Sequence, residues 1–196
     1  MTRLGSSFLG VVLAGFLGGY FLAVARAQVE KERKGACLPL DPVVMDKAAP
    51  DFELPSRDGT TVRLRALRGK AVFLNFFLSS CQPCEEEMPG MERLGAALGG
   101  KGLAMVAVAA DERWEDVDRL FQRVLPSGKT GMTLLKDEGG RVASLYGTRL
   151  FPETYLIDRE GKIRFYFQGA RDWGSKAGQA CVESVLAAPG VASTGP

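Results

Sequence analysis

Two almost uninterrupted apolar runs, residues 71–78 and 103–110, constrain the fold of this chain more than any other feature. Together they are rich in Val and Phe, and runs that are apolar on every side are typical of strands covered on both faces of a sheet. Each is followed by a segment with apolar residues at helical spacing, 82–98 and 113–125. Strands that alternate with helices predict crossover units and a largely parallel sheet.

The flanking segments complete a mixed sheet. Further strands are predicted over 132–136, 153–158 and 162–168, and a last helix over 175–188. In the last strand apolar and polar residues alternate, and Glu160-Gly161 before it is a turn signal, so this end of the sheet is predicted to be antiparallel. Asp58-Gly59 within 52–65 likewise predicts a hairpin. The chain is therefore predicted to be an α/β protein, with a central mixed β-sheet flanked by helices and an N-terminal β-hairpin.

The N-terminal segment is apolar on every face. Residues 8–25 contain no charged side chain and lie between Arg3 and Arg26. The run is long for the core of a signal peptide and short for a spanning helix, and Ala25-Arg26-Ala27 offers a cleavage site. We expect export, with residues 1–27 acting as a signal anchor or a cleaved signal peptide; the length favours the anchor. The basic residues that follow do not match the positive-inside pattern.

The segment after this run is different in character. Residues 28–47 change from charged to mixed, contain prolines and show no sustained period, which is typical of a linker or a loosely docked extension. The folded domain is predicted over 48–190, and a short C-terminal tail over 191–196.

Charge and composition exclude several classes of function. The chain has 25 basic and 23 acidic side chains, and Arg3 and Arg26 are the only charged residues before Gln28, so the part that follows carries no net charge. A neutral domain lacks the basic surface that nucleic-acid binding requires. The sequence has no histidine, which removes the commonest general base and metal ligand and argues against a hydrolase triad.

Cys81 and Cys84 stand where a buried strand ends and a helix begins. The free N–H groups and dipole of a helix start stabilise an anion, so Cys81 is predicted to be the nucleophile. Cys84, one turn further along and more shielded, is placed to attack a mixed disulfide formed at Cys81. Half of a zinc site is the alternative, but the other cysteines, Cys37 and Cys181, do not form a second close pair.

The sequence resembles the TlpA/ResA type of thioredoxin-like thiol-disulfide oxidoreductase over about residues 48–188. The resemblance is carried by Ala49-Pro50-Asp51-Phe52, Gly69-Lys70, CQPCEEEMP at 81–89, Phe151-Pro152-Glu153-Thr154, Leu156-Ile157-Asp158 and Gly161-Lys162-Ile163. It implies a thioredoxin-like fold, an extracytoplasmic (periplasmic) domain anchored to the inner membrane through residues 8–25, and no cofactor. It also implies reduction of specific partner proteins, often in maturation of c-type cytochromes or copper centres, with electrons from a membrane thiol oxidoreductase. Ser80 departs from the aromatic residue usual in the family, which affects partner choice.

The resemblance also assigns roles beside the dithiol. It implies that Pro152 follows a cis peptide bond, although a proline that merely starts a strand is the alternative. Glu87 lies one turn after Cys84, at a position where the family has an acid, and is a candidate proton acceptor. Glu153, beside the proline, is a second candidate, and solvated charge is the alternative for both. The acids 85–87 oppose a thiolate, which favours a reducing dithiol.

Cys37 and Cys181 are predicted to form a structural disulfide. Once Cys81 pairs with Cys84, they are the pair that remains in an oxidising compartment, and two buried free thiols are the alternative.

Two other functions use the same segment. A peroxidase of this fold needs Thr or Ser three residues before the reactive cysteine, where this chain has Leu78. A Cu(I)-binding module would use Cys81, Cys84 and Met88 as soft ligands. Met88, however, shares a helical spacing with Met91 and Leu94, which predicts a core position.

Overall fold

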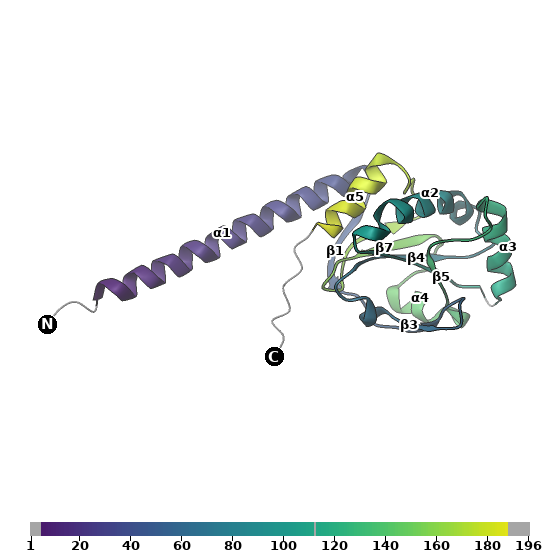
Figure 1. Cartoon of the computed structure of the whole chain (residues 1–196), viewed down its shortest axis with the longest axis horizontal. Coiled ribbons are helices and arrows are strands. Elements are labelled where there is room, and N and C mark those ends of the chain that lie inside the picture. Colours follow the sequence, from purple (N-terminus) through teal and green to yellow (C-terminus); the bar gives the residue numbers. More distant parts are fainter. Residues whose placement is uncertain (1–4, 112, 188–196) are drawn as a thin grey trace. The chain divides into compact units, whose positions relative to one another are not determined.

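The computed structural model describes the backbone of residues 5–111 and 113–187, and the side chains of that part from residue 19 onward. Its contacts divide the chain into two compact units, Met1–Gly35 and Ala36–Pro196, which are described separately here (Figure 1). The first unit contains most of helix α1 (Gly5–Cys37). Among the side chains that are described, no helix combines the length and the apolar character needed to cross a membrane.

Some of the predicted segments lie outside this description. They are the side chains of residues 8–18 in the predicted membrane segment, residue 188 at the end of the last predicted helix, and the tail at 191–196.

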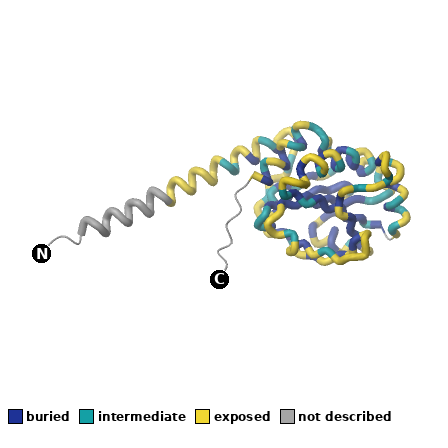
Figure 2. Tube along the Cα trace, in the orientation of Figure 1, coloured by how far each residue is buried: buried dark blue, intermediate teal, exposed yellow. Residues whose placement is uncertain are grey.

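The second unit is built on a six-stranded sheet in the order β1-β8-β7-β4-β5-β6 (Figure 1). Its strands are β1 (Val43–Ala48), β4 (Ala71–Phe77), β5 (Leu103–Ala109), β6 (Thr133–Lys136), β7 (Glu153–Ile157) and β8 (Lys162–Gln168). Strands β4, β5 and β6 are parallel, whereas β7, β8 and β1 are antiparallel to their neighbours. This confirms the predicted mixed sheet. The two apolar runs form the central strands: every residue of β4 and nearly every residue of β5 is buried (Figure 2).

Helices cover one face of the sheet. They are α2 (Gln82–Leu98), α3 (Trp114–Val124) and α5 (Lys176–Leu186), and their apolar side chains pack with Phe73, Phe77, Phe165 and Phe167 of the sheet. Burying each large side chain contributes about 1.5–3 kcal/mol. The last helix begins after Ser175, whose hydroxyl accepts a hydrogen bond from the N–H of Gly178.

The other face is covered by the predicted hairpin and by a short helix that was not predicted. The hairpin consists of β2 (Glu53–Pro55) and β3 (Thr61–Arg63), with Gly59 at a positive φ of 84° in its turn. Helix α4 (Arg141–Tyr146) has six residues, too few for a periodic pattern, and the carboxylate of Asp137 accepts hydrogen bonds from the N–H groups of Val142 and Ala143. Within residues 5–111 and 113–187 there are also four short 3-10 helices: η1 (Leu38–Leu40), η2 (Leu64–Leu67), η3 (Gly99–Lys101) and η4 (Glu138–Gly140).

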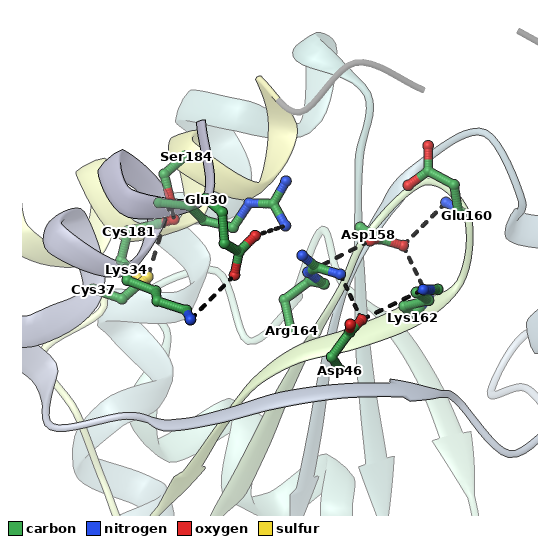
Figure 3. Close-up of polar contacts among 11 residues, drawn as sticks. Glu30, Lys34, Cys37, Asp46, Asp158, Glu160, Lys162, Arg164, Cys181 and Ser184 are labelled. Carbon is green, nitrogen blue, oxygen red and sulfur yellow. Dashed lines mark hydrogen bonds and ion pairs between the residues drawn. A yellow bond between two sulfur atoms is a disulfide. The ribbon is translucent and has the colours of Figure 1, made fainter. Parts of the chain in front are cut away.

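The extension predicted over 28–47 is regular along most of its length. Helix α1 continues to Cys37, η1 follows, and β1 joins the sheet as an edge strand paired with β8. The sequence gives no strand signal here, because most of β1 is exposed and its register shifts between Val44 and Lys47. In addition to the backbone pairing, ion pairs join β1 to β8: Asp46 pairs with Lys162 and Arg164, and Arg164 also pairs with Asp158 (Figure 3).

Candidate active site

The Cys81–Cys84 pair lies between the end of β4 and the first turn of α2. The two cysteines form a disulfide, and Cys81 is the N-cap of α2, with its Sγ 3.2 Å from the N–H of Cys84. Cys84 is fully buried, whereas Cys81 is partly exposed. Solvent and a partner protein can therefore reach the sulfur of Cys81, which also lies where the helix dipole stabilises a thiolate.

The loop before β7 passes beside Cys81. The Phe151–Pro152 peptide bond is cis, the isomer that the family resemblance implies. The carbonyl oxygen of Phe151 lies 3.4 Å from the Sγ of Cys81, and the neighbouring Leu150 is 60% exposed. The loop that contacts Cys81 thus carries an exposed apolar side chain one residue before Phe151.

The short loop that leads into the dithiol is held by Asp111. The N–H of Ser79 donates to Oδ2 of Asp111 at 2.9 Å, and the hydroxyl of Ser79 donates to Oδ1. Asp111 follows β5, so this contact fixes the loop against the neighbouring strand. Ser80, between that loop and Cys81, is exposed.

Glu87 is a buried carboxyl, 4% exposed, with three hydrogen-bond donors around it. Asn75 Nδ2 donates to Oε1 at 2.8 Å, while Trp173 Nε1 and the main-chain N–H of Arg171 donate to Oε2 at 3.1 and 3.2 Å. Burial raises the pKa of Glu87 to about 7, and these three donors, with the charge of Arg171, oppose the rise. A carboxyl with this pKa gains and loses a proton near neutral pH, as an acid–base group must.

Asn75 connects Glu87 to the strand beside it. It is fully buried in β4, and its Nδ2 also donates to the hydroxyl of Thr154 in β7 at 3.0 Å. Its Oδ1 has no hydrogen-bond partner within the described part of the chain. Rotation of the amide would present that oxygen to a protonated Glu87, so Asn75 suits both protonation states of the carboxyl.

The three acids after Cys84, which were predicted to oppose a thiolate by their charge, have separate environments. Glu85 forms an ion pair with Arg123 that lowers its pKa. Glu86 is exposed and accepts a hydrogen bond from Gln82. Glu87 alone is buried and lies on the face of α2 that carries Cys84.

Glu153 is not brought to the dithiol. Its side chain is buried, accepts a hydrogen bond from the Tyr155 hydroxyl at 3.3 Å, and lies on the opposite face of the sheet from Thr154. Burial and this carboxylate raise the pKa of Tyr155 to about 12, and they also raise the pKa of Tyr166. Glu153 belongs to a polar cluster under the sheet, away from Glu87.

Several residues of the site were not predicted as functional. Asn75 is a lone polar residue in a buried apolar run, which is a signal that was available in the sequence. Trp173 is fully buried and packs edge-on against Phe73 and Phe167, as a core residue does, while its indole N–H binds Glu87. Arg171 contributes through its main chain, which carries no sequence signal.

A hollow of about 280 Å³ opens beside Glu87. It is lined by Glu86, Glu87, Pro89, Gly90, Arg93, Ala170, Arg171 and Asp172. Charged side chains of both signs surround it, so it gives the buried carboxyl a polar route to solvent.

Among the described residues, no three His, Cys, Asp or Glu side chains lie close enough together to hold a metal ion. Met88 is fully buried in the core with Met91 and Leu94, as the helical spacing predicted.

Comparison with known proteins agrees with this geometry. Residues 45–166 match the model of the AhpC/TSA family. The chain belongs to this family. Among its relatives, the thiol-disulfide oxidoreductase ResA of Bacillus thuringiensis subsp. konkukian is 34% identical over 117 residues, covering 60% of this chain. The match spans 65% of the length of that relative.

Solved structures identify the fold of this AhpC/TSA family member. A protein described as thiol:disulfide interchange protein DsbE from Chlorobium tepidum is 32% identical, with a TM-score of 0.65, covering 72% of this chain and 96% of the other. The thioredoxin domain of a thiol-disulfide oxidoreductase from Bacteroides vulgatus has a TM-score of 0.63 at 23% identity, covering 74% and 99%. The fold is thioredoxin-like, as predicted.

Proposed function

We propose that this protein is a thiol-disulfide oxidoreductase that reduces disulfides of partner proteins through Cys81 and Cys84. The observation that carries the proposal is the asymmetry of the pair. Cys81 is accessible at the start of α2 and faces the cis-proline loop, whereas Cys84 is fully buried behind it. The names of the relatives support the same activity.

The reaction consists of two exchanges. The Cys81 thiolate attacks one sulfur of a partner disulfide, so a Cys81–partner bond forms, the partner S–S bond breaks, and the leaving thiolate takes up a proton. Cys84 then loses its proton and attacks Cys81, which forms the Cys81–Cys84 disulfide and releases the second partner thiol. Two electrons and two protons pass to the partner, and a thiol donor must restore the dithiol.

We place this activity outside the cytoplasm, at the periplasmic side of the inner membrane. A buried disulfide between Cys37 and Cys181 supports an oxidising compartment, and the uncharged run at 8–25 supports export and anchoring. A membrane thiol oxidoreductase would then supply electrons, and protein substrates in cytochrome c or copper-centre maturation fit the family resemblance.

The reduction potential of the Cys81–Cys84 pair tests the proposal. We expect a value more negative than about −200 mV, which marks a reductant, when the full chain is equilibrated with glutathione buffers and alkylated thiols are counted by mass. A value near −120 mV would indicate an oxidant that inserts disulfides. If the pair never forms a disulfide at any ratio of oxidised to reduced glutathione, the proposed function is wrong.

Replacing Glu87 tests its role as the proton acceptor for Cys84. Only the ionised carboxylate accepts a proton, and burial raises the pKa of Glu87 to about 7. We therefore expect Glu87→Gln to slow the attack of Cys84 on the mixed disulfide about 100-fold above pH 7. Well below pH 7 the wild-type carboxyl is already protonated, so the two proteins should converge.

Stopped-flow measurement of that step between pH 5 and pH 9 checks this expectation. Glu86→Gln is the matched control, because it removes a neighbouring acid that is exposed on the same helix. Equal slowing of the Glu87 variant at both ends of the pH range would show that the substitution acts through packing.

A further inference from the structure

One guanidinium group braces the loop that contacts Glu87. Arg171 Nε donates to the carbonyl of Leu40 at 2.7 Å. Its Nη1 donates to the carbonyls of Gln168, Gly169 and Ala170 at 3.0, 3.2 and 3.0 Å. The side chain of Arg171 thus closes the loop after β8 on itself and also joins that loop to η1.

The same loop reaches the site at two points. The main-chain N–H of Arg171 donates to Glu87 Oε2 at 3.2 Å, and the N–H of Gly169 donates to the carbonyl of Pro152 at 2.8 Å. Gly169 has a positive φ of 81°, which a side chain would disfavour. The loop conformation therefore determines whether the carboxylate keeps this donor.

The Leu40 end of the brace is fixed by the second disulfide. Leu40 follows Cys37 by one turn of η1. Cys37 forms a disulfide with Cys181 of α5 (Figure 3), and both cysteines are fully buried. Ser184 lies against this bond, with its Oγ 3.9 Å from the Sγ of Cys37, and donates to the carbonyl of Cys181. The Leu40 carbonyl is thus held within a few residues of a covalent link to the core.

We propose that Arg171 is a positioning residue for Glu87, and that the Cys37–Cys181 disulfide holds the Leu40 carbonyl against which Arg171 is braced. The second disulfide then sets the proton affinity of Glu87 without contacting the dithiol. This inference deepens the proposed function, because it rests on Glu87 acting in the exchange.

Charge alone is the rival explanation. The charged groups around Glu87 are Glu86 and Arg93 of α2 and Arg171 and Asp172 of the loop, whereas β4 and β7 present the uncharged Asn75 and Thr154. Arg171 is the cation that lowers the pKa of Glu87, but its Nε and Nη1 donate to four carbonyl groups. Its direct contact with the carboxylate is the main-chain N–H.

The test is a titration of the Glu87 carboxyl by ¹³C NMR in the oxidised full chain, with the signal assigned through Glu87→Gln. Arg171→Lys keeps the charge but cannot bridge four carbonyls, and Arg171→Gln removes both. We expect Arg171→Lys to raise the pKa of Glu87 by about one unit, because a lost hydrogen bond to a charged group is worth about that shift. Arg171→Gln also removes the positive charge, so it should raise this pKa at least as much. If Arg171→Lys titrates like the wild type, charge is the cause and the brace is wrong.

Two further variants test the disulfide. Cys37→Ala/Cys181→Ala removes it, and two glycines inserted after Cys37 keep it but release Leu40, which covers the case in which the double variant does not fold. We expect both to raise the pKa in the same direction as Arg171→Lys. A wild-type titration in the folded forms would overturn the link to the disulfide.

Asp46→Asn is the matched control. It removes the ion pairs of Asp46 in β1 with Lys162 and Arg164 (Figure 3) but does not alter Leu40. The pKa of Glu87 should therefore stay unchanged in this variant. A shift equal to that of Arg171→Lys would mean that any loosening of β1 has this effect, which would contradict the proposal. The titration needs no exchange activity. Failure of the proposed function would appear separately, as a Cys81–Cys84 pair that never forms a disulfide in glutathione buffers.

Discussion

Cys84→Ser is expected to trap the protein in a mixed disulfide with its partner, whereas Cys81→Ser is expected to abolish thiol-disulfide exchange. In Cys84→Ser the sulfur of the partly exposed Cys81 still attacks a partner disulfide, but no second thiolate remains to resolve the product. In Cys81→Ser the only dithiol sulfur left is Cys84, which is 0% exposed. We expect the exchange rate of that variant to fall at least about 1000-fold, as for loss of a covalent nucleophile.

Mass spectrometry under non-reducing conditions, after incubation with a disulfide-bonded protein, checks both variants. The trapped product should carry the partner on Cys81, and the wild type should release its partner in the same assay. Mixed disulfides at Cys84 in the Cys81→Ser variant would reverse the assigned roles.

The central strands and the dithiol were predictable because their signals are local. A run such as 71–77 is apolar on both faces because both faces of β4 are covered. The strand-to-helix position of Cys81 follows from neighbouring residues alone. The edge strand β1 has one partner and exposed side chains, so its sequence carries neither an apolar run nor an alternation.

The surroundings of Glu87 were not predictable, because its partners come from distant parts of the chain. Asn75, Arg171 and Trp173 lie 12, 84 and 86 residues from it. Spacing on one helix indicated that Glu87 shares a face with Cys84, but nothing in the sequence shows which strand or loop meets that face.

Glu153 shows how a one-residue step decides a role. Side chains alternate between the faces of a strand, so Glu153 and Thr154 point in opposite directions. Thr154 faces Asn75 and the dithiol side, whereas Glu153 joins Tyr155 beneath the sheet. Proximity to Pro152 in sequence suggested a role for Glu153, but it did not indicate which face of β7 the side chain occupies.

Removal of the Cys37–Cys181 disulfide is expected to have the largest effect on stability. The bond joins residues 144 apart, and a loop of that length restricts the unfolded chain by about 4–5 kcal/mol on the chain-entropy model. Cys37→Ala/Cys181→Ala should therefore lower the free energy of unfolding by about this amount, which corresponds to a fall in Tm of roughly 10–20 °C.

Urea unfolding of the oxidised proteins measures the difference, and the m-value separates two explanations. If the bond acts on the unfolded chain, its removal lets that chain expand, so m rises as stability falls. Cys81→Ala/Cys84→Ala is the matched control, because the same model gives only about 2 kcal/mol for so short a loop. Equal losses in the two double variants, with m unchanged, would show that packing around the sulfurs outweighs loop closure. That result would leave the Cys37–Cys181 bond as a local contact of α5 and not as a restraint on the unfolded chain.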